Sequence, residues 1–259
     1  MAKMGNGYGS EFHLLRYLGY HRNVLNRKTE AATGGRVIEW LDFPSDSGEK
    51  LDAEWKGVAF ADSASLKSAW QEFWPQSGNV PNWDAVGRLE TDAGIEFLLV
   101  EAKAHVEELR SSCGARKEEM NGDPEEERRK SGIAKIRAAL ESTIDAHSFA
   151  VGVERWLEPY YQYANRLAHL HFLNEHKIPA RLLFIYFCGD HWAGRLLRDG
   201  RPPVCPKDAA AWSFPLQEMN HRLGLHGRSQ LEQRVHKIFL PVRIAEAGTE
   251  HGAGAVAAG

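Results

Sequence analysis

Apolar positions at the start of the chain follow helical spacing. They recur from residue 10 onward as Phe12, Leu14, Leu15, Leu18, Tyr20, Val24 and Leu25. This spacing predicts an amphipathic helix. Ser10 is the expected N-cap, because its hydroxyl can accept a free backbone N–H of the first turn. The helix is expected to end near Gly34, and the glycine-rich residues 1–9 before it are expected to be flexible.

The pattern then changes to the period-two alternation of strands. Residues 37–43, VIEWLDF, predict one strand, and residues 51–61 are compatible with a second short one. Two further strands are predicted at 83–89 and 95–102, joined by turn residues. The second of these has a nearly unbroken apolar core, IEFLLV, which is typical of a central strand covered on both faces. A short helix is expected at 63–73.

The second half of the chain reads as helices around one more buried strand. Pro124 followed by acids is typical of a helix start, and this helix should run to about residue 147. A second long helix is expected at 156–176, a buried strand at 181–188, and short helices at 215–223 and near residue 229. This element order predicts an α/β (α+β) fold with a mixed central sheet flanked by helices.

Domain organisation and localisation follow from length and composition. The 259 residues suffice for a single domain over residues 10–245, with a charged loop at about 111–124 and a disordered tail at 246–259. No apolar run approaches the roughly 18 residues of a membrane span, and no secretory signal opens the chain. A cytoplasmic protein without a membrane partner is therefore expected.

Net charge gives no overall signal for nucleic acid. The chain carries 32 basic and 35 acidic residues, a net charge of −3, which counts against tight non-specific binding to duplex DNA. A local basic channel remains compatible with this balance. The three cysteines are far apart and are expected to be reduced thiols.

The candidate chemistry lies at the ends of the two hairpin strands. Glu101 and Lys103 are two positions apart on a strand, so both side chains point to one face. Asp84 joins them only if it lies opposite Glu101, since a shift of one residue in register would move it to the other face. Two adjacent carboxylates repel each other unless a cation such as Mg²⁺, with Mn²⁺ as a substitute, neutralises them. The backbone carbonyl of Ala102 could add a ligand.

Lys103 would then orient or deprotonate an attacking water, or neutralise charge in the transition state of phosphoryl chemistry. A simple surface ion pair between Glu101 and Lys103 explains the same spacing without any catalysis. The predicted position at the end of an apolar strand, rather than on an exposed edge, favours the catalytic interpretation.

Asn82-Trp83-Asp84 followed by Val100-Glu101-Ala102-Lys103 resembles the motif of the PD-(D/E)xK nuclease superfamily, although the motif's proline is absent here. Members of this superfamily share an αβββαβ, restriction-endonuclease-like core. The resemblance implies metal-dependent hydrolysis of phosphodiester bonds in nucleic acid, with DNA expected ahead of RNA. It implies that Asp84 and Glu101 bind the metal and that Lys103 is the catalytic lysine. Glu11 matches the acid that the first helix contributes in many members.

The second long helix carries a polar stripe at i, i+3, i+4 and i+7, formed by Gln162, Asn165, Arg166 and His169. Such a stripe can line a channel for substrate phosphates, and a solvated helix face is the alternative. Several branches of the superfamily carry a glutamine in this helix followed four residues later by an aromatic residue, where this chain has Arg166.

Two alternatives to an active nuclease stay open. The chain could be a catalytically inactive nuclease-fold domain that binds nucleic acid or protein, or a hydrolase that uses the same acids on another substrate. A homodimer and a complex with partner proteins are both compatible with the sequence. Duplex or single strand, and endonuclease or exonuclease action, are not distinguished.

Overall fold

The structure is a computed structural model that describes residues 8–41, 55–76, 80–113, 124–190 and 196–243. Several expectations fall on the remaining residues. Most of the N-terminal segment 1–9, most of the charged loop at 111–124 and the whole tail at 246–259 lie outside the described residues.

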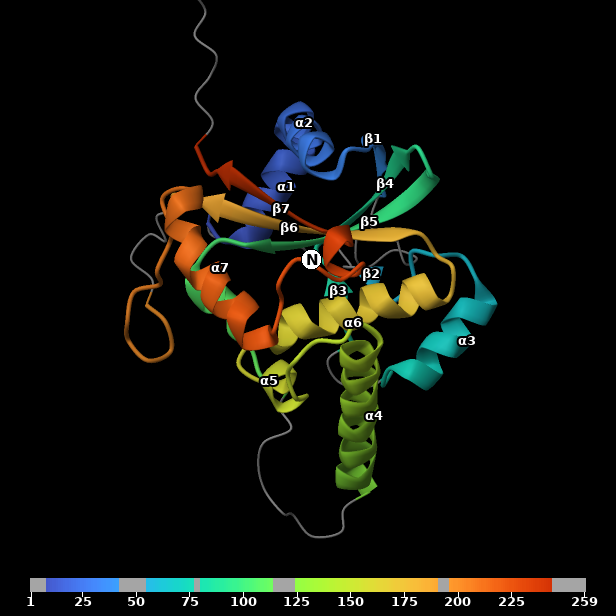
Figure 1. The fold of residues 1–259 in the computed structure, drawn as a ribbon. Coiled ribbons are helices and arrows are strands. Elements are labelled where there is room, and N and C mark those ends of the chain that lie inside the picture. Colours follow the sequence, from blue (N-terminus) through green and yellow to red (C-terminus); the bar gives the residue numbers. More distant parts are fainter. Residues whose placement is uncertain (1–7, 42–54, 77–79, 114–123, 191–195, 244–259) are drawn as a thin grey trace, which may run out of the picture.

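A five-stranded mixed sheet organises the fold (Figure 1). Its strands, in spatial order, are β1 (Arg36–Trp40), β4 (Ala85–Thr91), β5 (Gly94–Lys103), β6 (Ala180–Cys188) and β7 (Val235–Pro241). The first three pair antiparallel, whereas β5, β6 and β7 pair parallel. The predicted mixed central sheet is therefore confirmed, and the apolar run at 95–102 forms its middle strand.

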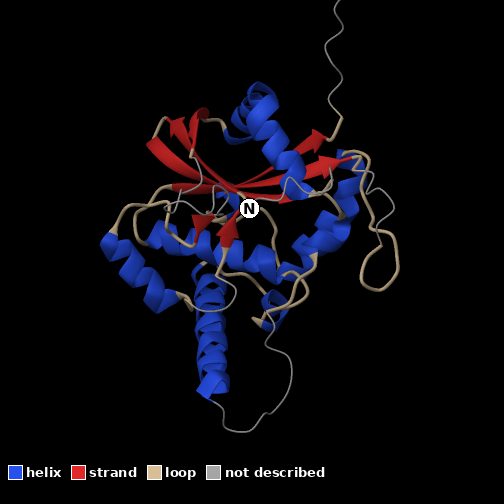
Figure 2. Cartoon of the chain, turned by 180° about the vertical axis from the view of Figure 1, so that it is seen from behind, coloured by secondary structure: helices blue, strands red, loops and turns tan. Residues whose placement is uncertain are grey.

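Helices cover both faces of this sheet, as Figure 1 and the reverse view in Figure 2 show. On one face lie α1 (Ser10–Tyr20) and α2 (Arg22–Thr33). On the other face lie α3 (Ala64–Phe73), α4 (Pro124–Ala146), α5 (Glu154–Leu157), α6 (Tyr161–Glu175) and α7 (Ala209–Leu223). The smaller elements are a two-stranded sheet of β2 (Trp55–Lys56) and β3 (Asn82–Trp83), and the 3-10 turns η1 (Val106–Leu109) and η2 (Glu232–Arg234). Among the described helices, none combines the length and apolarity needed to cross a membrane.

Side-chain alternation along β5 divides the core in two. Leu98, Val100 and Ala102 pack in the cluster beneath α1 and α2. Leu99 points the other way, into the larger cluster beneath α6. By the same alternation Glu101 and Lys103 project from one shared face, as predicted, and this is the face that α6 covers. The larger cluster also contains the buried indoles of Trp70, Trp74 and Trp83.

Helix boundaries differ from prediction where local capping decides them. The first predicted helix is broken at His21, and Gly9 rather than Ser10 precedes its first residue. The helix predicted at 156–176 is interrupted by Pro159, which cannot donate a backbone N–H, so α5 and α6 are separate. The end of α2 is as expected, because Gly34 adopts the left-handed conformation with φ 71°.

The C-terminal part departs further from the prediction. α7 begins before Pro215, because the Asp208 side chain caps it by accepting the N–H of Ala211 at 2.8 Å. Ser229 and Glu232 form the reciprocal bonds of a capping box, 3.1 Å and 3.0 Å long. Only the turn η2 follows them, so the expected late helix is wrong. The chain instead enters β7, an edge strand that the sequence analysis missed.

Candidate active site

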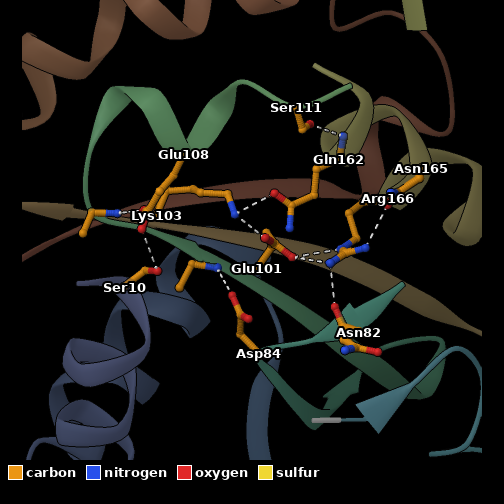
Figure 3. A network of polar contacts seen from close by, with 12 residues as sticks. Ser10, Asn82, Asp84, Glu101, Lys103, Glu108, Ser111, Gln162, Asn165 and Arg166 are labelled. Carbon is orange, nitrogen blue, oxygen red and sulfur yellow. Dashed lines mark hydrogen bonds and ion pairs between the residues drawn. The ribbon is translucent and has the colours of Figure 1, made fainter. Parts of the chain in front are cut away.

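The hairpin register brings Asp84 to the end of β5 (Figure 3). Ala85 pairs with Val100, and the N–H of Asp84 donates to the Val100 carbonyl at 3.1 Å. The Asp84 carboxyl oxygen Oδ2 in turn accepts the N–H of Ala102 at 2.7 Å. Continuing the antiparallel register by one residue sets Asp84 opposite Glu101, which is the alignment that the candidate chemistry requires.

Glu101 is a buried carboxylate held by two cations. Its Oε1 contacts the ammonium of Lys103. Its Oε2 accepts a hydrogen bond from Nε of Arg166 at 2.9 Å and forms an ion pair with Nη2 of the same guanidinium at 2.7 Å. Burial alone would raise the pKa of Glu101, but the charges of Arg166 and Lys103 outweigh it and the pKa is lowered. Glu101 is therefore ionised in the folded protein.

Lys103 lies between β5 and α6. Its Nζ donates to the side-chain oxygen of Gln162 at 3.0 Å as well as to Glu101. Burial opposes its charge, yet the carboxylates of Glu101, Asp84 and Glu108 together raise its pKa. The raised pKa keeps Lys103 in its ammonium form in the folded chain. Its positive charge suits the neutralising role.

Asp84 has the most strongly perturbed carboxyl of the cluster. Burial, and then the charge of Glu101, raise the pKa of Asp84 to about 8, against smaller opposing effects of Lys103, the Ala102 N–H and Arg166. Within the described residues its second oxygen, Oδ1, accepts no hydrogen bond. Asp84 is thus mostly protonated at neutral pH when no further cation is near.

Helix α6 supplies the facing polar side chains. The Arg166 guanidinium donates to the Asn165 side-chain oxygen at 2.8 Å and to the Asn82 carbonyl at 2.6 Å. Its central carbon lies 4.8 Å from the centre of the Trp83 ring. The N–H of Gln162 donates to the Ser111 hydroxyl at 2.7 Å, which fixes the start of the helix. Gln162, Asn165 and Arg166 therefore converge on the acidic hairpin.

The fourth member of the predicted stripe does not converge. His169 is fully buried, with ring centres 4.0 Å from Trp70 and 4.9 Å from Trp83. Burial holds its pKa well below the usual value, so the ring is neutral. The structure therefore places His169 apart from the other three residues of the stripe. The alternative of a solvated helix face is wrong, because Asn165, Arg166 and His169 are buried.

Glu11 is placed differently from Asp84 and Glu101. Its side chain is exposed in the first turn of α1, and among the described residues it makes no hydrogen bond or ion pair with the cluster. Its neighbour Ser10 does reach inward, donating to Glu108 at 3.2 Å.

Glu108 in η1 is the flanking acid that the sequence analysis missed. Its Oε2 accepts the N–H of Ala104 at 2.5 Å, and its Oε1 lies 3.4 Å from Nε2 of His105. Its charge also contributes to the raised pKa of Lys103. The available signal was an acid five residues beyond the motif lysine, just after the end of an apolar strand.

A cavity of about 280 Å³ gives access to Asp84 from the side of β3. Its lining combines the loop before β3, the segment after η1 and the start of α6: Val80, Pro81, Asn82, Asp84, Ser111, Ser112, Tyr161, Gln162, Asn165 and Arg166. Three of the four predicted substrate-binding residues thus border one hollow together with a predicted metal ligand.

No protein-family model, curated protein or solved structure matches this chain. Over the described ranges, no group of three or more His, Cys, Asp or Glu side chains is arranged to hold a metal ion. Two carboxylates of the cluster could bind a cation. Asp84 could do so with Oδ1, and Glu101 could do so with the oxygens that contact Lys103 and Arg166 in this structure.

Proposed function

We propose that this chain is a metal-dependent nuclease that hydrolyses phosphodiester bonds, in DNA ahead of RNA. The observation that carries the proposal is the carboxyl of Asp84, which lies beside Glu101 with its pKa raised to about 8. Keeping two such carboxylates together costs free energy unless a cation compensates them. The resemblance of residues 82–84 and 100–103 to the PD-(D/E)xK motif supports the same conclusion.

The donor types at this position suit Mg²⁺ or Mn²⁺. Asp84, Glu101 and the Ala102 carbonyl would provide oxygen ligands, which these ions prefer. When bound, the ion supplies positive charge to polarise a phosphate oxygen and to activate water. The bond from the Ala102 N–H to Asp84 Oδ2 fixes the orientation of this carboxylate and leaves Oδ1 directed elsewhere.

The protein's own cations perform the remaining electrostatic work in this proposal. Lys103 is held between Glu101 and Gln162, so its ammonium is oriented before a substrate arrives. It would neutralise the charge that develops on phosphate oxygens in the transition state. Arg166 borders the cavity at Asp84 and is oriented by Asn165, which places a second positive charge beside an incoming phosphate.

Cleavage assays test the proposal directly. Labelled single-stranded and duplex DNA and RNA are incubated with the wild-type chain, Asp84→Ala and Lys103→Ala, with Mg²⁺, with Mn²⁺ or with EDTA. Each variant should lose about 100-fold or more in rate, the scale measured for removing one electrostatic stabiliser of a transition state. Lys67→Ala, at an exposed lysine on α3, is the matched control and should cleave like wild type. A wild-type protein inert on every substrate, or a Lys103→Ala variant as active as wild type, would contradict the proposal.

The ion pair of Arg166 with Glu101 favours a second candidate, an inactive nuclease-fold domain that binds nucleic acid or protein. Both oxygens of Glu101 already contact cations of the same chain, so this carboxylate is neutralised without a metal. Calorimetric titration with Mn²⁺ separates the two functions. Nucleic-acid or protein binding without any metal-binding heat in the wild-type chain would favour the binding domain.

A further inference from the structure

A second and larger cavity, of about 720 Å³, opens along a different side of α6 from the cavity at Asp84. Its lining comes from α2, α6, α7, the following loop, η2 and β7: Ala32, Tyr163, Leu167, Gln217, Asn220, His221, Leu225, His226, Gly227, Glu232, Val235, His236 and Lys237. None of these residues borders the cavity at Asp84. The volume lies within the range of about 300–1,000 Å³ that is typical of small-molecule sites.

The register of the sheet relates this cavity to the acidic cluster. Glu101 pairs with Phe184, and Phe184 pairs with Lys237. The three side chains therefore project from one face in a row, and strand spacing separates Glu101 from Lys237 by roughly 10 Å. Tyr163 stacks on Phe184 with ring centres 4.3 Å apart. The two aromatic rings divide the larger cavity from the acidic cluster.

Lys237 is the cation that faces this cavity. Its Nζ lies 3.4 Å from the Asn220 side-chain oxygen and 5.9 Å from the centre of the Tyr163 ring. No carboxylate of the described residues forms an ion pair with it. Burial lowers the pKa of Lys237, with partial compensation from the charge of Glu232. A half-buried amine without a close counter-ion is a ready binding partner for an anion.

Glu232 is not available as that counter-ion. Its Oε1 accepts the N–H of Gly227 at 2.6 Å. Its Oε2 accepts the N–H groups of Arg228 at 3.1 Å and Ser229 at 3.0 Å, and the Ser229 hydroxyl at 2.9 Å. Turning toward Lys237 would break these bonds. Glu232 therefore holds the backbone of residues 227–229, and the Lys237 amine can bind a ligand.

The other lining groups suit an anion with an organic body. Asn220 and Gln217 carry amide donors, and His221 stands exposed at the rim. His236 adds a buried Nε2 atom that has no hydrogen-bond partner within the described residues. Burial lowers the pKa of this imidazole, which makes it a neutral group able to accept a hydroxyl hydrogen. His236 and Lys237 point to opposite faces of β7, so the cavity follows the free edge of that strand.

We propose that this cavity binds a small phosphomonoester. The phosphate would lie at Lys237, whose compact ammonium is a common partner of phosphate oxygens, with the amides of Asn220 and Gln217 as further donors. The organic part would pack along Leu167 and Leu225, and one hydroxyl would donate to His236. This site is separate from the proposed nuclease site and does not depend on its activity.

Calorimetric binding to the full chain in EDTA tests the proposal, with adenosine 5′-monophosphate, inorganic phosphate and adenosine as probes. The monophosphate should bind, and uncharged adenosine should bind about tenfold or more weakly, because a hydrogen bond to a charged group contributes about 1.5–3 kcal/mol. Lys237→Gln should weaken binding of the monophosphate by a similar factor. Lys207→Gln, at an exposed lysine outside the cavity, should bind it like wild type.

Two further variants keep the test decisive. His221→Glu alters only the exposed rim, so it should fold normally and weaken the monophosphate several-fold by placing a negative charge at the entrance. Asp84→Asn reports on the other cavity. The proposal is overturned if no probe binds wild type, if Lys237→Gln and His221→Glu both bind like wild type, or if Asp84→Asn alone abolishes binding. The last result would place the nucleotide at the acidic hairpin.

Discussion

Arg166 and Glu101 form a buried ion pair, with Nη2 of the guanidinium 2.7 Å from Oε2 of the carboxylate. Their side chains are only 5% and 3% exposed. The other oxygen of Glu101 contacts Lys103 on the same strand. Glu101 therefore joins the end of β5 to α6 through Arg166, and Lys103 adds a second link through Gln162. This arrangement sets the charge of the cluster that Asp84 completes, and it connects the stability of the fold to the chemistry of the site.

Removing the guanidinium should destabilise the protein strongly. Arg166→Met leaves Glu101 with Lys103 as its remaining cation, and breaking a buried pair on one side costs about 3–5 kcal/mol of unfolding free energy. Arg137→Met is the matched control, because the ion pair of Arg137 with Glu154 is exposed and such pairs contribute about 1 kcal/mol or less. Urea denaturation measures both. Equal losses in the two variants would show that Glu101 does not depend on Arg166.

Stability should fall with rising pH because of Asp84. The pKa of Asp84 is about 8 in the folded chain, and the ordinary value for this side chain is 3.8, so between these values the folded state keeps a proton that the unfolded state has lost. The resulting stabilisation is fully present below about pH 4 and disappears as pH rises through about 8. Asp84→Asn lacks this pH dependence, so its free energy of unfolding relative to that of wild type should increase between pH 5 and 9.

The gain is at most about 4 kcal/mol, since the three pH units between 5 and the folded pKa of about 8 correspond to about 1.4 kcal/mol each, and residual solvent contact of Asp84 reduces it. Urea denaturation in EDTA at several pH values measures it. If the free energies of unfolding of wild type and Asp84→Asn changed with pH in the same way, the raised pKa of Asp84 would be contradicted.

Metal affinity should rise with pH over the same window. A divalent cation competes with the proton on Asp84, so the apparent Mn²⁺ affinity should increase by up to about tenfold per pH unit below pH 8. Titration calorimetry at pH 6.5, 7.5 and 8.5 measures this slope. Asp84→Asn should abolish most of the binding, whereas Asp145→Asn, at an exposed acid of α4, should leave it unchanged. A wild-type affinity that does not vary with pH would mean that the ion binds elsewhere.

Glu108 and Glu11 can be separated experimentally. Glu108→Gln weakens the bond to the Ala104 N–H and removes a charge near Lys103, so it should destabilise the chain by about 1–3 kcal/mol. Glu11→Gln changes an exposed side chain and should shift stability by no more than about 0.5 kcal/mol. Thermal melts and the cleavage assay applied to both variants show which acid supports the site. A larger loss of cleavage in Glu11→Gln than in Glu108→Gln would support the role for Glu11 that the sequence resemblance implies.

Local sequence patterns were sufficient to predict the helices and strands that carry a strong periodic signal. The apolar run at 95–102 indicated the central strand, because only a strand covered on both faces can lack alternation. The spacing of Glu101 and Lys103 placed both side chains on one face for the same geometric reason. β7 escaped prediction because its half-buried edge position leaves a weak pattern, and its place is decided by parallel pairing with β6.

The sequence by itself determined which side chains share a strand or a helix face, since these relations follow from the fixed periods of backbone geometry. Only the tertiary structure decided which faces meet. It set the hairpin register that brings Asp84 to Ala102, and it turned Arg166 toward Glu101 while burying His169 between tryptophans. It also brought Glu108, rather than Glu11, into contact with the end of β5. Apart from the local bond between Ala104 and Glu108, these contacts join residues far apart in the chain, so they depend on packing between elements that no local pattern records.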